Sequence, residues 1–184
     1  MPAPQPKKAW PVLLIVLLVL SPFCLVGVVA VGAAIAIPAF ISYTRRAKTA
    51  EATTNLRSMF VAASAYYERE HPGPDGQVLR HCTVDPASTE IVPGPQPQVA
   101  YPAGIPPSFR ALDFYLDDPV YYQYEIDGPP GGCDRPADSA VYSFRAHGNL
   151  DGDTTLSMFE LAVGTTPDNV LMRAPGFYIL NELE

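Results

Sequence analysis

The first long stretch of the chain is apolar and contains no charged residue. No charged residue occurs from Val12 to Ile37, a length greater than the roughly 20 apolar residues that cross a bilayer as a helix. We therefore predict a transmembrane helix over residues 12–41, behind a disordered, proline-rich tail at residues 1–11. A secretory signal peptide is the alternative, but its apolar part is only about 7–15 residues long.

Beyond residue 41 the apolar residues recur at spacings of three and four, which is the period of an amphipathic helix. They are Ala52, Leu56, Met59, Phe60, Ala63, Tyr66 and Tyr67. The opposite, polar face is predicted to hold Glu51, Asn55, Arg57 and Glu68. Pro72 and Pro74 stop the helix, since proline cannot donate to its hydrogen-bond ladder. The pattern thus predicts an amphipathic helix at residues 42–71 and a β-rich head at residues 72–184.

Strand-like runs separated by turn residues follow in the head. Runs rich in β-branched and aromatic residues lie at 120–126, 140–146, 155–163 and 177–180. The seven prolines from Pro86 to Pro107 indicate an irregular segment without regular pairing, and residues 108–112 read as a short capped turn. Short links between the runs predict an antiparallel sheet of roughly four strands covered by the helix, and hence an α+β fold.

Charge is unevenly distributed along the chain. The sequence has 19 acidic and 12 basic side chains. Sixteen of the acidic side chains follow residue 70, whereas only five of the basic ones do. Because phosphate backbones are gripped by clustered Lys and Arg, we expect no nucleic-acid partner for the head. Basic residues flank both ends of the apolar stretch (Lys7 and Lys8, then Arg45, Arg46 and Lys48), so charge alone does not decide its orientation.

The head contains two cysteines, Cys82 and Cys133. A disulfide between them is the leading interpretation, and it is typical of an oxidising compartment. Free thiols are one alternative. A zinc site completed by His81 and His147 is another, although zinc sites usually show closer CxxC-like spacing.

Two segments resemble the type IV pilins. Residues 33–40, AAIAIPAF, resemble the AAIAIPNF segment of that family, and residues 47–56, AKTAEATTNL, are similar to its AKxxEAKTNL continuation. Residues 119–124 and 148–153 look, more loosely, like head segments of pilins from myxobacteria. The resemblance implies a pilin-like plan, a long helix packed on an antiparallel sheet. It also implies a single-pass protein of the bacterial inner membrane with its head in the periplasm or outside the cell.

The chain departs from the pilin pattern at two positions. Val16 stands where the family has its prepilin-peptidase glycine, and Ser21 stands where it has a glutamate that meets the N-terminal amine of a neighbouring subunit. A carboxylate in lipid is costly unless it is paired, and here the pair is missing. We therefore expect the N-terminal tail to be retained, so that the mature protein begins at or near Met1 and stays in the membrane.

Small residues in the apolar stretch suggest a helix-packing surface. Gly27, Gly32, Ala33 and Ala34 would let another helix approach closely in lipid, and Pro38 belongs to the same surface. Cys24 is expected to be one more small apolar residue of this stretch.

Residues 149–160 contain a candidate calcium loop. Asn149, Asp151, Asp153 and Glu160 lie at the spacing of the oxygen ligands of an EF-hand loop, and calcium takes six to eight oxygens. Thr154, however, occupies the position where that loop requires glycine. The alternative is a hairpin whose Asp-Gly turn adopts a positive φ.

Nothing in the sequence predicts an enzyme, since none of its three histidines lies near a nucleophile motif or a phosphate-binding loop. We expect a pilin-like structural or interaction protein, a subunit or membrane-resident accessory of a type IV pilus or type II secretion apparatus. Its partners would be membrane lipid, other pilin-like subunits and the pilus or secretion machinery. The alternative is a membrane-anchored extracytoplasmic binding module that captures calcium or a partner and does not enter a filament. Calcium is the one cofactor that the sequence suggests.

Overall fold

The computed structural model describes the backbone of residues 10–184 and the side chains of residues 26, 27 and 29–184. The described chain has one long helix, α1 (Trp10–Glu68), one short helix, α2 (Pro107–Ala111), and antiparallel strands. It falls into two compact units, which adjoin in sequence between Thr44 and Arg45. The chain is therefore an α+β protein, as predicted from its sequence.

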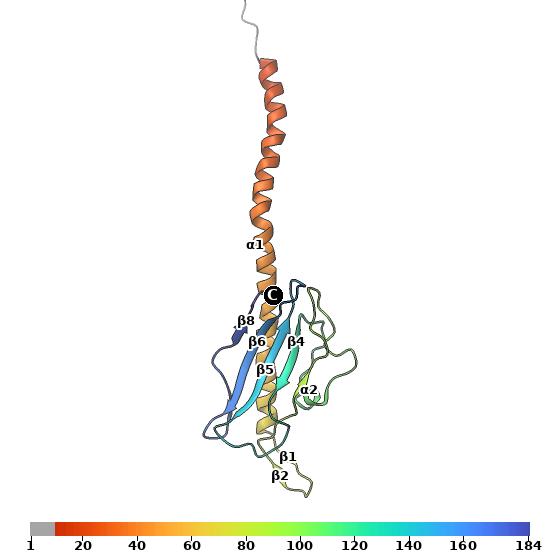
Figure 1. Cartoon of the computed structure of the whole chain (residues 1–184), viewed down its shortest axis with the longest axis vertical. Helices are drawn as coiled ribbons and strands as arrows, with labels where there is room; N and C mark the ends of the chain where they lie inside the picture. Colours follow the sequence, from red (N-terminus) through yellow and green to blue (C-terminus); the bar gives the residue numbers. More distant parts are fainter. Residues whose placement is uncertain (1–9) are drawn as a thin grey trace, which may run out of the picture. The chain divides into compact units, whose positions relative to one another are not determined.

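The second unit is built on a six-stranded antiparallel sheet (Figure 1). Its strands are β3 (Ala87–Ser88), β4 (Tyr122–Asp127), β5 (Ala140–Gly148), β6 (Ser157–Thr165), β7 (Leu171–Arg173) and β8 (Tyr178–Leu180). They run in the order β3-β4-β5-β6-β7, and β8 also pairs with β6. A separate small hairpin consists of β1 (His71–Pro72) and β2 (Val78–Leu79).

The prediction of roughly four strands identified β4, β5, β6 and β8 but missed β3 and β7. These two strands have only two and three residues, and neither contains the β-branched or aromatic residues that mark β8. β3 lies within the proline-rich segment that was predicted to lack pairing, and Gln98 in the same segment forms a bridge with Val120. That part of the prediction was wrong, because short pairings with β4 and with Val120, which precedes β4, interrupt the irregular chain.

The short turn predicted at residues 108–112 is α2, which differs from the expectation at its start. Pro106 precedes the helix without a side-chain capping bond, and Pro107 is its first residue. Proline suits this position because the first N–H groups of a helix have no intrahelical partner. The helix therefore begins on the fixed φ of proline rather than on a serine cap.

The head part of α1 covers one face of the sheet, and Figure 1 shows it behind the strands. Its apolar stripe is buried as predicted; the residues exposed by at most 1% are Ala52, Leu56, Met59, Ala63 and Tyr67. Phe60 and Tyr66 are half-buried at the border of the same core. Residues alternate along the central strands between buried and partly exposed positions. The core thus lies between this helix face and one face of β4, β5 and β6.

Among the residues whose side chains are described, no helix combines the length and the apolar content needed to cross a bilayer. Residues 1–9 of the predicted tail lie outside the described residues, and the side chains of Val16, Ser21 and Cys24 do as well. Half of the segment predicted to span the membrane is therefore not described at the level of side chains. The transmembrane helix and the retained N-terminus stay predictions.

Candidate functional site

The first unit presents an apolar helix surface at residues 26–43, a segment without any charged residue. Its exposed large side chains are Val26, Val29, Val31, Ile35, Ile37, Phe40, Ile41 and Tyr43. A helix that is apolar all round is typical of a protein core or a membrane span. We call this segment the apolar helix surface.

The residues predicted for helix packing lie on this surface. Gly27, Gly32, Ala34 and Pro38 are exposed, and Ala33 is half-buried. A Cβ built on either glycine would meet no atom within 4 Å. The structure thus leaves room at both glycines for a neighbouring helix, and α1 remains helical through Pro38.

A polar cluster joins α1 to β4 inside the head. Glu51 accepts hydrogen bonds from the Tyr121 backbone N–H at 2.9 Å and from the Tyr124 hydroxyl at 3.0 Å. Asn55 donates to the same hydroxyl at 2.8 Å. One turn before Glu51, Lys48 lies over the Tyr121 ring, 4.2 Å from its centroid, and donates to a backbone carbonyl oxygen. These contacts fix the axial position of the helix on the sheet.

Glu51 and Asn55, predicted on the polar face of the helix, do not face solvent freely, because both turn toward β4 and are half-buried. Arg57 and Glu68 are exposed as expected. Glu51 and Asn55 are four residues apart, and each immediately precedes a residue of the buried stripe, Ala52 or Leu56. That adjacency is the signal by which the cluster could have been found.

Burial governs the ionisation of this cluster. Desolvation raises the pKa of the Glu51 carboxyl above its ordinary value of 4.5, although hydrogen bonds from Tyr121 and Tyr124 act in the opposite direction. Desolvation also raises the pKa of Tyr124, and the charge of Glu51 raises it further. The folded head therefore binds a proton at Glu51 more tightly than the unfolded chain does.

We expect Glu51 to stabilise the head more at low pH than at high pH. A carboxyl whose pKa is raised on folding contributes stability that is fully present below pH 4.5, the unfolded value, and is lost as the pH rises through the higher folded value. The measurement compares urea unfolding of the wild type with that of Glu51→Gln across this window, using tyrosine near-UV circular dichroism. The difference in unfolding free energy, wild type minus variant, should fall as the pH rises. A difference that grows with pH would contradict this prediction.

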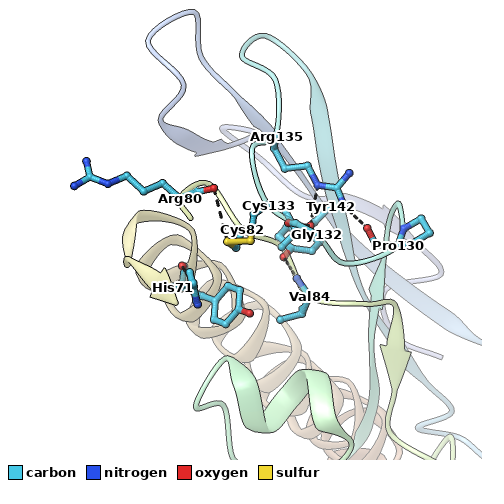
Figure 2. Close-up of a disulfide and its surroundings, with 11 residues drawn as sticks. His71, Arg80, Cys82, Val84, Pro130, Gly132, Cys133, Arg135 and Tyr142 are labelled. Carbon is cyan, nitrogen blue, oxygen red and sulfur yellow. Dashed lines mark hydrogen bonds between the residues drawn. A yellow bond between two sulfur atoms is a disulfide. The ribbon is translucent and has the colours of Figure 1, made fainter. Parts of the chain in front are cut away.

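A disulfide joins Cys82 and Cys133, which confirms the pairing expected from the sequence (Figure 2). Free thiols and a zinc site are thereby excluded for these two cysteines. Next to the disulfide, Thr83 and Gly132 form a backbone bridge. The Tyr142 hydroxyl accepts a hydrogen bond from the Val84 N–H at 2.8 Å. The disulfide therefore links the segment after β2 to the segment before β5, next to the sheet.

The histidines proposed for the zinc alternative have separate partners. His81 contacts Asn169 through Nδ1 at 2.9 Å, and Asn169 also accepts a hydrogen bond from the Tyr67 hydroxyl at 2.8 Å. His147 lies on β5, 3.4 Å from Glu125. The first group ties the end of α1 to the disulfide segment and to the turn between β6 and β7, so its role is structural.

The candidate calcium loop is organised by its own hydrogen bonds. Asn149 Oδ1 accepts from the Gly152 N–H at 2.8 Å, and Asp151 Oδ1 accepts from the Asp153 N–H at 3.2 Å. Gly152 has a φ of 81°, the positive value expected of an Asp-Gly turn. Asp153 Oδ1 accepts from the Thr155 N–H at 2.6 Å, so a cation would share the Oδ1 atoms of both aspartates with backbone N–H groups.

The structure brings Asp151 and Asp153 together with Glu184 rather than with Glu160. One carboxylate oxygen from each of the three lies within 4.8 Å of the others. A hydrogen bond between Glu184 and Asp151 raises the pKa of Glu184 and lowers that of Asp151. Arg45 lies 3.5 Å from Asp151. Sequence reasoning missed Glu184, because it is remote from the loop along the chain and shares no spacing with it.

Glu160, the fourth predicted ligand, lies on the outer face of the sheet. It accepts a hydrogen bond from the Ser143 hydroxyl and lies 3.7 Å from Arg145. Arg145 also contacts Asp127 at 2.9 Å and Glu125 at 3.8 Å. Glu160 thus belongs to a group of charges on β4, β5 and β6 that is centred on Arg145.

Calcium remains a prediction for the loop, and the placement of the carboxylates sharpens its test. If the folded head alone binds calcium, a concentration of roughly ten times Kd stabilises it by about 1.4 kcal/mol. We expect Glu184→Gln to reduce the calcium-induced rise in Tm and Glu160→Gln to preserve it, because only Glu184 lies beside Asp151. The measurement is thermal unfolding with millimolar calcium and with chelator. A Tm that neither addition moves would remove the site.

No protein-family description, curated protein or solved structure matches this chain. Any functional conclusion therefore rests on the chemistry of its own surfaces.

Proposed function

We propose that the chain is a pilin-like structural and interaction protein, held in the bacterial inner membrane by the first part of α1. It would act as a subunit or membrane-resident accessory of a type IV pilus or type II secretion apparatus, with its head in the periplasm or outside the cell. The observation that supports this proposal is the apolar helix surface, on which eight large apolar side chains are exposed. Covering such a surface is favourable by roughly 25 cal/mol per Å². Lipid and neighbouring helices are the natural cover.

The junction between α1 and the sheet also supports a pilin-like plan. Residues 47–56, which resemble the pilin continuation, supply Lys48, Glu51 and Asn55, and all three bind the sheet or the loop beside it. The same segment supplies Ala52 and Leu56 to the core. The pilin-like motif thus coincides with the part of α1 that holds the head.

Membrane anchoring is tested by placing a charge on the apolar helix surface. Val26 lies near the middle of the predicted span and is 69% exposed. An aspartate at the centre of a membrane helix opposes insertion by about 3 kcal/mol. We expect Val26→Asp to reduce the fraction of the chain that resists alkaline extraction from membranes. Val61→Asp, on the head part of the same helix and 64% exposed, is the matched control. Wild-type protein that alkaline treatment releases would refute the anchor.

Participation in a filament needs its own measurement. Surface filaments sheared from cells and probed for this chain would identify a filament subunit. Its absence from them, together with retention in the membrane, would identify a resident accessory. Intact mass of the extracted protein adds the state of the N-terminus, and loss of about sixteen residues would indicate processing and favour the subunit.

An anchored calcium-binding module is the second candidate function. The convergence of Asp151, Asp153 and Glu184 favours it. The calcium titration described above, combined with absence from sheared filaments, would select this candidate over the filament subunit.

A further inference from the structure

β8 forms an open edge of the large sheet. It pairs with β6 along Met158, Phe159 and Glu160, and within the described chain no strand pairs with its other side. Figure 1 shows β8 at the outer edge of the sheet, beside β6. An edge strand presents a row of unpaired backbone N–H and C=O groups, which can template the pairing of another chain.

β8 has one of the features that protect such an edge, its length of three residues, and lacks the others. Proteins commonly block an edge strand with charged side chains, proline or a bulge. Tyr178, Ile179 and Leu180 are instead uncharged and 58%, 41% and 43% exposed. Their pairing with β6 runs through three consecutive residues without a register shift. This edge is therefore open to strand addition in both its backbone and its side chains.

An apolar groove adjoins the edge on the face of the sheet opposite α1. Its volume is about 600 Å³, and its lining includes Ala162, Met172, Ala174 and Pro175. Met172 lies on β7, and Ala174 and Pro175 belong to the link between β7 and β8, so the groove lies beside the start of this link. In strand addition, main-chain bonds provide affinity and pockets for alternate side chains provide specificity. The groove is such a pocket for an apolar side chain.

The far end of β8 is acidic. Asn181 follows the strand, Glu182 and Glu184 come after it, and Asp151 and Asp153 lie beside Glu184. Arg45, 3.5 Å from Asp151, is already paired with it. Basic side chains on an incoming strand would meet complementary charge here, whereas acidic ones would be repelled.

We propose that the β8 edge binds an extended segment of a partner protein, in which basic and apolar residues alternate, by β-strand addition. The backbone of the segment would pair with β8, its apolar side chains would enter the groove, and its basic side chains would face the acidic end. The proposal concerns the head alone and does not depend on the fate of the apolar helix surface.

The test uses the full chain in non-ionic detergent and a short fluorescent peptide of alternating Lys and Val, followed by anisotropy. We expect this peptide to bind and its Glu-Val counterpart to bind at least about tenfold more weakly. Two versions of the Lys-Val peptide carry backbone N-methyl groups on alternate residues, one version for each edge of the peptide. Blocking the edge that pairs should weaken binding by about tenfold or more, whereas blocking the other edge should not. Empty micelles provide the background.

Variants of the chain complete the experiment. Leu180→Lys puts a protective charge on the edge and should weaken binding of the Lys-Val peptide by about tenfold. Val170→Lys adds the same charge at a half-exposed position just before β7 and should leave binding nearly unchanged. The proposal is overturned if the peptide does not bind, or if both N-methylated versions bind as well as the parent. Self-association of the chain that Leu180→Lys abolishes would assign the edge to a second copy instead.

Discussion

Removal of the disulfide lowers the free energy of unfolding of the head by about 4 kcal/mol, because the bond closes a long loop in the unfolded chain. Cys82 and Cys133 are separated by 51 residues, and the entropy lost on closing a loop grows slowly with its length. The variant is Cys82→Ala together with Cys133→Ala. Its urea midpoint, followed by tyrosine near-UV circular dichroism of the full chain in detergent, should fall well below that of the wild type.

Two controls accompany this prediction. Wild-type protein under reducing conditions should match the double variant, since both lack the same covalent link. Cys24→Ala removes the remaining cysteine of the chain and should leave the midpoint unchanged. Equal midpoints for oxidised and reduced wild type would show that the unfolded chain is already compact around this loop.

The second large effect is expected at the interface between α1 and the sheet. Leu56 is fully buried, in a core that includes Phe109, Tyr124 and Phe144. Truncating a buried leucine to alanine removes its transfer free energy and leaves a cavity, and such changes cost about 2–5 kcal/mol. We expect Leu56→Ala to destabilise the head by this amount in urea unfolding.

Val61→Ala is the matched control for Leu56→Ala. Val61 lies on the same helix and is 64% exposed, so its truncation should change stability by no more than about 0.5 kcal/mol. Equal effects of the two substitutions would mean that the helix does not form the lid of the sheet in solution. The position of α1 on the sheet would then need another explanation.

The sequence by itself determined the α+β class, the buried face of α1 and the positions of four strands. These features depend on local periodicity, because a helix repeats every 3.6 residues and a strand every two. These periods can be recognised in the sequence wherever an element is long enough to contain several repeats, as in β5 and β6. The disulfide could also be predicted from the sequence, since the head has only two cysteines.

Only the tertiary structure decided which polar residues meet. Glu51 sits on β4 instead of facing water because its helix packs in one axial position on the sheet. Glu184 joins Asp151, whereas Glu160 faces Arg145, because strand pairing and not spacing along the loop places the side chains of β6. The open β8 edge likewise follows from the strand order, because β7 and β8 both pair with β6 and lie along the same side of it. Such contacts join residues far apart in the sequence, and no local period encodes them.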